Sequence, residues 1–238
     1  MNALPHRRIK SNLNAQFARI GAAFSSAKRL EILDLLAQTE RSVEHIARNI
    51  GQSVGSTSAH LKVLHSARLV DRRRDGQRVI YTLADTSVFA LLRTLQAVGT
   101  HQLAEVEQLV RRYYDAPQDF QPVTPSELQR RIEQDDVLVL DVRPEEEYAA
   151  GHIPGARNVP PDELEQLLSR LPRDREIVAY CRGPYCLFAV DAVRLLRQRG
   201  FEARRLTGGL PDWSAEGRPI AAGTVDRITN NNEIGIVT

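Results

Sequence analysis

Apolar residues in the first half of the chain recur every three or four positions, which is the spacing of amphipathic helices. This spacing predicts helices over residues 12–24, 27–38 and 43–50. It also predicts a fourth helix from Val54, with Leu61, Val63 and Leu64 on its buried side and Thr57 as a further candidate there. Serines able to cap a helix N-terminus precede the last three of these helices: Ser25 and Ser26, Ser42, and Ser53. The third and fourth helices are short, and a turn containing Gly51 separates them, so the pattern predicts a helix-turn-helix.

The residues after the fourth helix predict a β-hairpin over 69–83. Alternating or β-branched residues flank Asp75-Gly76, a pair that favours a tight turn. Four arginines lie near its tip: Arg72, Arg73, Arg74 and Arg78. Such a concentration of one charge indicates a wing that lies along a phosphate backbone. A last apolar stripe, from Asp85 to Tyr114, predicts a long helix that needs a partner surface.

The pattern changes after residue 115. Residues 116–122 contain two prolines and predict a linker, after which Thr124 or Ser126 caps a new helix. Short apolar runs typical of buried strands, such as Val137–Val142 and Ile177–Tyr180, then alternate with helical segments. This alternation predicts an α/β domain with a mainly parallel sheet. The expected organisation is therefore a mainly α-helical winged domain over 1–115, the linker, an α/β domain over 123–221, and a loosely attached tail over 222–238.

Composition and charge narrow the class of protein. The chain of 238 residues has a net charge of +2, but residues 1–115 hold 17 Lys and Arg against 10 Asp and Glu, whereas residues 116–238 hold 15 against 20. A basic first half and an acidic second half favour nucleic-acid contact by the first. No apolar run reaches the length of a membrane span, and no apolar core follows the basic N-terminus as in a secretory signal. We therefore expect a cytoplasmic protein with no membrane partner.

Both cysteines of the chain lie in one loop, Cys181-Arg182-Gly183-Pro184-Tyr185-Cys186, between a predicted strand and a predicted helix. A loop of this kind directs backbone N–H groups and a helix N-terminus at its contents, which stabilises a thiolate. Gly183 permits close approach to the sulfur of Cys181, and Pro184 stiffens the loop. Arg182 and Tyr185 face either the substrate or the solvent. For Cys186 we favour a small buried residue over the alternative, a thiol that resolves a persulfide on Cys181.

The run from Ser56 to Leu83, with the helical pattern before it, resembles the ArsR/SmtB family of winged helix-turn-helix repressors. The resemblance implies that the fourth helix enters the major groove of double-stranded operator DNA while the wing contacts phosphates. It also implies a homodimer through the first and last helices, which suits a palindromic operator. Carried over by position, the groove-facing residues are Val54, Gly55, Ser58 and Ala59, with Ser56, Thr57, His60 and Lys62 nearby. Gly55 and Ala59 have no side-chain group for reading a base edge.

Metal sensing, which many members of that family perform, is not expected here. The family's usual thiolate site needs a Cys-x-Cys segment where this chain has Ser42–Arg48, which contains no cysteine. On the last helix only His101 and Glu105 are spaced for a metal site, and such a pair is more typical of a helix surface. We predict neither a metal nor another cofactor.

Three segments of the second half resemble the rhodanese family: Leu138–Pro160, the strand and loop ending in Cys181, and Leu206–Ile220. The resemblance implies that Cys181 carries sulfur taken from a small donor and passes it to a thiol acceptor. It implies mainly structural roles for Asp141, Arg143, His152, Gly155 and Trp213. Phosphatases with a related loop have an arginine six residues after the cysteine. Here Leu187 occupies that position, which disfavours phosphatase chemistry.

These features lead to one favoured hypothesis and three alternatives. The favoured hypothesis is a DNA-binding regulator, a repressor, whose rhodanese domain forms a Cys181 persulfide and so senses or transfers reactive sulfur. The second is a sulfurtransferase that binds DNA constitutively. The third is an inert rhodanese module, and the fourth is an arsenite-like metalloid sensor that uses both thiols. The sequence leaves catalytic turnover open.

Overall fold

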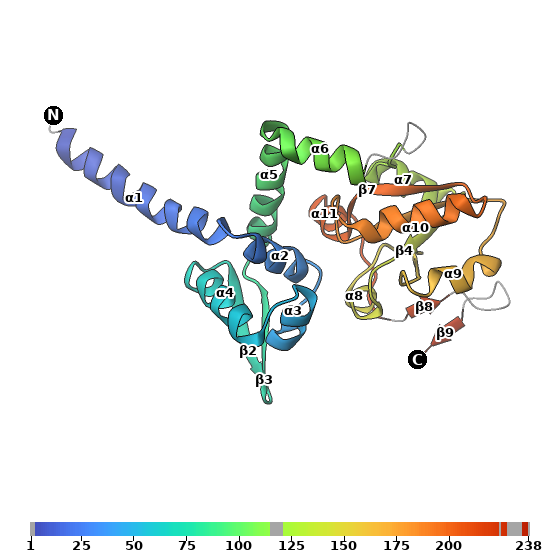
Figure 1. Cartoon of the computed structure of the whole chain (residues 1–238), viewed down its shortest axis with the longest axis horizontal. Coiled ribbons are helices and arrows are strands. Elements are labelled where there is room, and N and C mark those ends of the chain that lie inside the picture. Colours follow the sequence, from blue (N-terminus) through green and yellow to red (C-terminus); the bar gives the residue numbers. More distant parts are fainter. Residues whose placement is uncertain (1–2, 115–120, 224, 228–234, 238) are drawn as a thin grey trace. The chain divides into compact units, whose positions relative to one another are not determined.

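A computed structural model describes residues 3–114, 121–223, 225–227 and 235–237. The chain forms two compact units, Met1–Val98 and Gly99–Thr238, which are described separately (Figure 1). Most of the predicted linker, residues 116–120, lies outside the described residues. The domain boundaries expected above stay predictions.

The first unit contains the helices that the apolar spacing predicted, with bounds α1 Ala3–Phe24, α2 Ala27–Leu36, α3 Val43–Asn49 and α4 Val54–Ser66. Two of the predicted serine caps are confirmed, since Ser42 accepts a hydrogen bond from the backbone N–H of His45 and Ser53 accepts one from Ser56. Ser26 occupies the N-cap position of α2, but its side chain makes no capping bond. Gly51 ends α3 with a φ of 61°, as a turn between two helices requires.

The predicted wing is present as two antiparallel strands, β2 Val70–Asp75 and β3 Arg78–Leu83, and the short strand β1 Arg41–Ser42 pairs with the other edge of β3. Gly76 has a φ of 58° at the first central position of the turn, where a two-residue hairpin favours glycine. Buried side chains of α2, α3, α4 and the wing form one hydrophobic core, which includes Ile32, Ile46, Leu61 and Val70.

The long helix predicted from Asp85 to Tyr114 is wrong as a single element. The structure has two helices instead, α5 Thr86–Gln102 and α6 Ala104–Tyr113, separated by Leu103 in an extended conformation with φ −110° and ψ 109°. Gly99 and Thr100 in the last turn of α5 have low helix propensity, which weakens the helix where it ends. His101 and Glu105 consequently lie on different helices.

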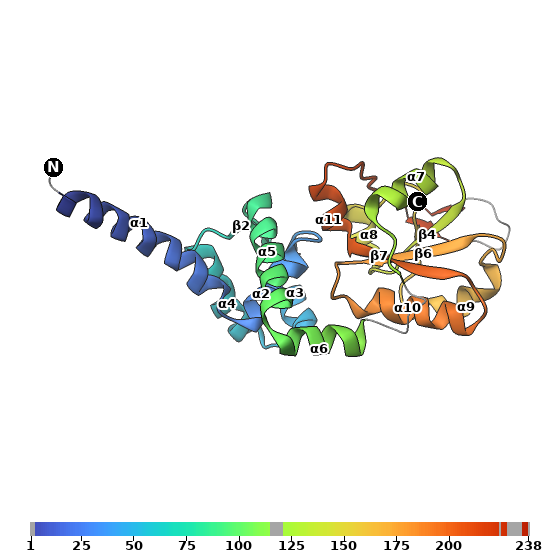
Figure 2. The same cartoon turned by 90° about the horizontal axis from the view of Figure 1, so that it is seen from above.

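The second unit is built on a four-stranded parallel sheet in the order β5-β4-β6-β7, which confirms the predicted α/β fold (Figure 2). The strands are β4 Val137–Asp141, β5 Arg157–Asn158, β6 Glu176–Cys181 and β7 Ala203–Gly209. All five residues of β4 are buried, as expected for a central strand covered on both faces.

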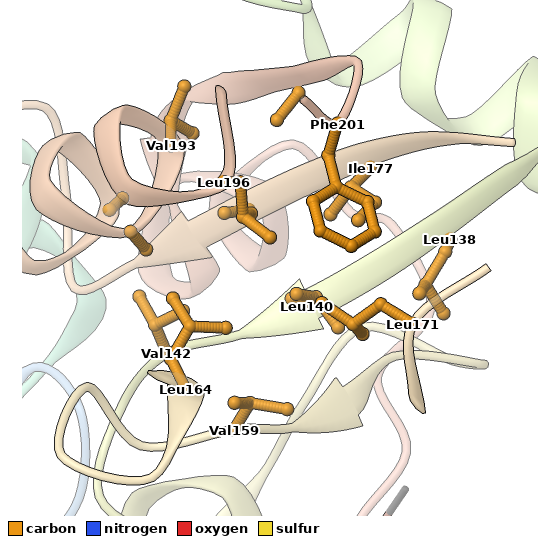
Figure 3. Packing of buried hydrophobic residues seen from close by; sticks show 14 of the residues in the cluster. Leu138, Leu140, Val142, Val159, Leu164, Leu171, Ile177, Val193, Leu196 and Phe201 are labelled. Carbon is orange, nitrogen blue, oxygen red and sulfur yellow. The ribbon is translucent and has the colours of Figure 1, made fainter. Parts of the chain in front are cut away.

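Helices cover both faces of this sheet. Side chains from α9 Leu164–Leu167, the 3₁₀ turn η1 Leu168–Arg170 and α10 Leu187–Gln198 pack on one face, where Figure 3 shows Leu140, Ile177 and Leu196 meeting in the same core. Helices α7 Pro125–Glu133, α8 Glu145–Ala150 and α11 Leu210–Ala215 cover the other face. Thr124 caps α7 by accepting the N–H of Glu127, as predicted.

The tail expected to be loose contains two short strands, β8 Val225–Arg227 and β9 Gly235–Val237, which pair antiparallel. Just before them, His152 and Ala221 form a backbone bridge. Three-residue strands are too short to give a recognisable apolar period, so the sequence pattern did not predict them. Within the described ranges, none of the helices has the length and apolar character needed to cross a membrane.

Candidate functional sites

Strand β6 and helix α10 position the cysteine loop. Cys181 is the last residue of β6 and only 1% exposed, whereas Cys186 is half-buried at the N-cap position of α10. The loop closes through a hydrogen bond from the Cys186 backbone N–H to the Gly183 carbonyl at 3.1 Å. The positive end of the α10 dipole therefore lies at the second cysteine of the loop.

Cys181 and Cys186 form a disulfide, with their Cα atoms 6.2 Å apart. This bond corrects the preference for Cys186 as a small buried residue, because Cys186 is half-buried and covalently paired. Spacing alone left this open, since two residues five apart reach bonding distance only if the loop folds back on itself.

Arg182 is held by Glu147, a residue that the sequence analysis did not single out. The Arg182 Nε lies 3.0 Å and 3.1 Å from the two Glu147 carboxylate oxygens, and its Nη2 lies 2.6 Å from Oε1. The Glu147 side chain, from α8, is completely buried. Arg182 therefore links the loop to α8 through this ion pair, whereas the sequence analysis expected it to face either the substrate or the solvent. Three consecutive glutamates precede Tyr148, and only burial distinguishes Glu147 from the other two.

Tyr185 is hydrogen-bonded to two residues that precede the rhodanese-like segments within the second unit: Thr100 in the last turn of α5 and Tyr114 at the C-cap of α6. Its hydroxyl lies 2.6 Å from Thr100 Oγ1, and its carbonyl accepts a hydrogen bond of 2.8 Å from the Tyr114 hydroxyl. The Tyr114 and Tyr185 rings also meet edge to face, with centroids 5.9 Å apart. Burial raises the pKa of Tyr114, which keeps its hydroxyl protonated and able to donate. We call these three residues the tyrosine clasp: Thr100, Tyr114 and Tyr185.

Gly209, at the end of β7, lies directly against the backbone of the cysteine loop. A Cβ atom there would be 2.4 Å from the Cys181 carbonyl oxygen and the Arg182 carbonyl carbon, and 2.5 Å from the Gly183 nitrogen. The preceding Gly208 has a φ of 89°. These two glycines of the third rhodanese-like segment thus allow β7 to approach the loop more closely than any side chain would permit.

A buried polar network lies at the C-terminal end of β4, beside the residue that precedes the cysteine loop. Arg143 forms an ion pair with Asp141, with Nη2 to Oδ2 at 2.6 Å, and both side chains are fully buried. Tyr180, which directly precedes Cys181, donates its hydroxyl to Asp141 at 2.6 Å. Burial alone lowers the pKa of Arg143, but attraction to Asp141 outweighs it and raises that pKa above the usual range. Burial likewise raises the pKa of Tyr180 well above its ordinary value.

The other residues with implied structural roles are also part of this scaffold. His152 is 5% exposed, stacks on the Tyr148 ring at 3.8 Å, and has its Nδ1 2.9 Å from the Tyr148 carbonyl. Trp213 is buried and donates its indole N–H to the Pro219 carbonyl at 2.8 Å, while Gly155 takes a φ of 79°.

Most residues predicted to contact DNA from α4 are exposed or partly exposed, and the structure corrects the predicted placement of two α4 residues. Val54, Gly55, Ala59 and Lys62 are exposed, whereas Ser56, Ser58 and His60 are partly exposed. Thr57 is 0% exposed and so is not available to DNA, because it faces the helical core. Val63, expected on the buried side, is 40% exposed, since the helix turns it away from Leu61 and Leu64.

The four wing arginines are all exposed. Arg73 forms ion pairs with Glu40 and Asp75, so part of its charge is compensated within the unit. Within the described part of the chain, Arg72 and Arg74 have no ion-pair partner.

Comparisons with known proteins cover both units. Residues 26–72 match the model of the bacterial regulatory protein arsR family, and residues 124–216 match that of the rhodanese-like domain. The HTH-type transcriptional regulator Rv0324 of Mycobacterium tuberculosis is 46% identical over 214 residues, which span 90% of this chain and 94% of that protein.

Two further relatives each match one half. A protein of Allochromatium vinosum named sulfurtransferase is 36% identical over 95 residues, covering 40% of this chain and 87% of that protein. The solution structure of the homodimeric winged helix-turn-helix DNA-binding domain of Mb0332 from Mycobacterium bovis is 43% identical, with a TM-score of 0.38, over 40% of this chain and 89% of that one. Because the similarity to Rv0324 extends through both units, this chain belongs to the arsR family of bacterial helix-turn-helix transcriptional regulators, with a rhodanese-like domain following the helix-turn-helix segment.

Proposed function

We propose that this protein is a homodimeric, cytoplasmic repressor whose affinity for operator DNA changes when Cys181 takes up sulfane sulfur as a persulfide. The observation that carries this proposal is the tyrosine clasp. Tyr185 belongs to the cysteine loop, and its partners Thr100 and Tyr114 lie in the stretch that directly follows the first unit along the chain. A chemical change in the loop therefore acts on residues that adjoin the DNA-binding unit along the sequence.

Two surfaces of the first unit support DNA binding and dimer formation. The exposed side of α4 and the wing arginines together provide a helix for the major groove and cations for phosphates. Apolar side chains of α1 and α5 remain exposed, which a second copy of the chain would bury: Ile9, Leu13, Phe17, Leu91, Leu95 and Val98.

The chemistry that we propose needs only the loop and a donor. In the reduced protein the Cys181 thiolate attacks a sulfane sulfur of inorganic polysulfide, and the shortened polysulfide leaves with the bonding electron pair. The product on the protein is an anionic persulfide, which the backbone N–H groups of a loop at a helix N-terminus stabilise.

Binding to the protein's own upstream DNA tests the proposal. We expect polysulfide treatment of the fully reduced dimer to change its affinity at least tenfold, reversibly by dithiothreitol, and to leave Cys181→Ser unaffected. Tyr114→Phe removes the hydrogen bond to Tyr185 and should still load sulfur, while its affinity changes less. Intact mass verifies in each sample that Cys181 has reacted, either by one added sulfur or by the loss of two hydrogens. Unchanged wild-type affinity after Cys181 has reacted would contradict the proposal and favour a sulfurtransferase that binds DNA constitutively.

Removing the wing arginines Arg72 and Arg74 should weaken both DNA binding and its dependence on salt concentration. For the double variant Arg72→Ala/Arg74→Ala, we expect the slope of log affinity against log salt to fall by about 0.9 per lost phosphate contact. Fluorescence anisotropy across a salt series measures both quantities. The matched control Arg130→Ala/Arg170→Ala removes the same charge from exposed positions in the second unit and should keep the wild-type slope. Equal slopes for both double variants would place the wing away from the phosphates.

A further inference from the structure

We infer that Cys186 is the resolving thiol of the loop: its thiolate attacks the Sγ of a Cys181 persulfide, releases hydrosulfide and leaves the Cys181–Cys186 disulfide. The inference rests on the proposed uptake of sulfur at Cys181. It adds a second reacting residue. It also means that the loop itself removes each persulfide formed on Cys181, by converting it to the disulfide.

The loop already has the geometry that this step requires. The Cα atoms of the two cysteines are 6.2 Å apart, within the range of about 4.4–6.8 Å that disulfides span. The hydrogen bond from the Cys186 N–H to the Gly183 carbonyl folds the loop back, and the ion pair with Glu147 fixes Arg182, the residue after Cys181. The two sulfurs therefore meet without unfolding either β6 or α10.

The surroundings of the two sulfurs differ, and this difference indicates that Cys186 attacks and that Cys181 is attacked. Cys181 is 1% exposed, which shields the inner sulfur of its persulfide from thiols in solution. Cys186 is half-buried at the N-cap of the twelve-residue helix α10, where the helix dipole favours a thiolate. The attacking sulfur and the attacked sulfur thus belong to the same loop, and an intramolecular attack is favoured over one from solution.

The step balances without an external oxidant. A bond forms between the Sγ atoms of Cys186 and Cys181, and the bond between the Cys181 Sγ and the outer sulfur breaks. The outer sulfur leaves as hydrosulfide with that electron pair, so it is reduced while the two cysteine sulfurs are oxidised. The thiol proton of Cys186 is lost before the attack and is available to the leaving hydrosulfide. Thiol–disulfide exchange with a cellular thiol reopens the loop.

Intact mass and alkylation under anaerobic conditions test the inference, because without oxygen the disulfide forms only through sulfur transfer. After one equivalent of inorganic polysulfide, the reduced wild-type chain should lose two hydrogens, gain no sulfur and resist alkylation at both cysteines. Cys186→Ser should instead retain one added sulfur on Cys181, with a persulfide lifetime longer by about tenfold or more. Cys181→Ser should take up none, and Cys186→Ala serves as a second variant should the serine disturb the loop.

The outcomes separate the two proposals. A wild-type chain that keeps a persulfide on Cys181 beside a free Cys186 overturns the resolving role alone. A folded Cys186→Ser chain that takes up no sulfur overturns the proposed function itself. Fluorescence of Trp213, the single tryptophan of the chain, shows whether each variant is folded.

Discussion

An Arg143→Met variant is expected to lose about 3–5 kcal/mol of the free energy of unfolding of the rhodanese-like domain. Arg143 and Asp141 are both completely buried, and Arg143 contacts both carboxylate oxygens of Asp141. Methionine fills a similar volume but leaves the Asp141 carboxylate buried with only the Tyr180 hydroxyl as a side-chain donor to its Oδ2. A buried charge without its counterion costs far more than the pair itself contributes.

Urea unfolding followed by tryptophan fluorescence measures this loss, because Trp213 is the only tryptophan and lies in the core of that domain. Arg175→Met is the matched control. Arg175 pairs with Asp135 at 2.9 Å, but their side chains are 43% and 84% exposed, so its removal should have little effect. A loss below about 1 kcal/mol for Arg143→Met would show that the buried pair does not stabilise the domain.

A Gly209→Ala variant is expected to slow sulfur uptake at Cys181 by about 100-fold, the effect of misplacing a reacting group by roughly an ångström. The added methyl group would lie 2.4 Å from the Cys181 carbonyl oxygen, and the atoms it meets belong to the backbone, which has no rotamer to change. The loop must therefore move away from β7. Overpacking of this kind also costs about 1–3 kcal/mol of stability.

Mass spectrometry of the reduced protein after rapid mixing with polysulfide measures the uptake rate. Gly151→Ala is the control in the same domain, since the two atoms nearest to its Cβ would be ends of side chains, Ile220 Cγ2 at 3.2 Å and Leu210 Cδ2 at 3.6 Å, and the nearest backbone atom, the Ala221 carbonyl oxygen, would lie 4.0 Å away. These side chains can shift, so uptake should stay close to wild type. If Gly209→Ala loads sulfur at the wild-type rate, the contact between β7 and the loop does not position Cys181.

The local pattern of the sequence was sufficient for most of the helices and strands. Apolar residues recurring every 3.6 positions identify α2–α4, alternating residues identify the wing, and short apolar runs identify the central strands. Each of these signals depends only on residues close together in the chain. The break at Leu103 and the tail strands were not predicted, because the apolar stripe continues through the break and the strands are only three residues long. The sequence left Thr57 as a candidate for both the buried side and the DNA-facing side of α4, since a small polar residue suits either, and its complete burial decides between them.

The candidate site likewise combines features that the local sequence predicts with contacts that only the tertiary structure creates. Residue types and spacing identified the Cys181 loop as one that stabilises a thiolate and the arginine-rich hairpin as a wing, while the resemblance to the rhodanese family implied that Cys181 carries sulfur. The partners of the loop come from distant parts of the chain: Glu147 for Arg182, Thr100 and Tyr114 for Tyr185, and Gly209 behind Cys181. No local period encodes such pairs, because a parallel sheet brings together segments separated by an entire helix. The amino-acid pattern therefore indicates the class of chemistry that we propose, and the packing of β4, β6 and β7 with their helices sets which residues contact and position the cysteine loop.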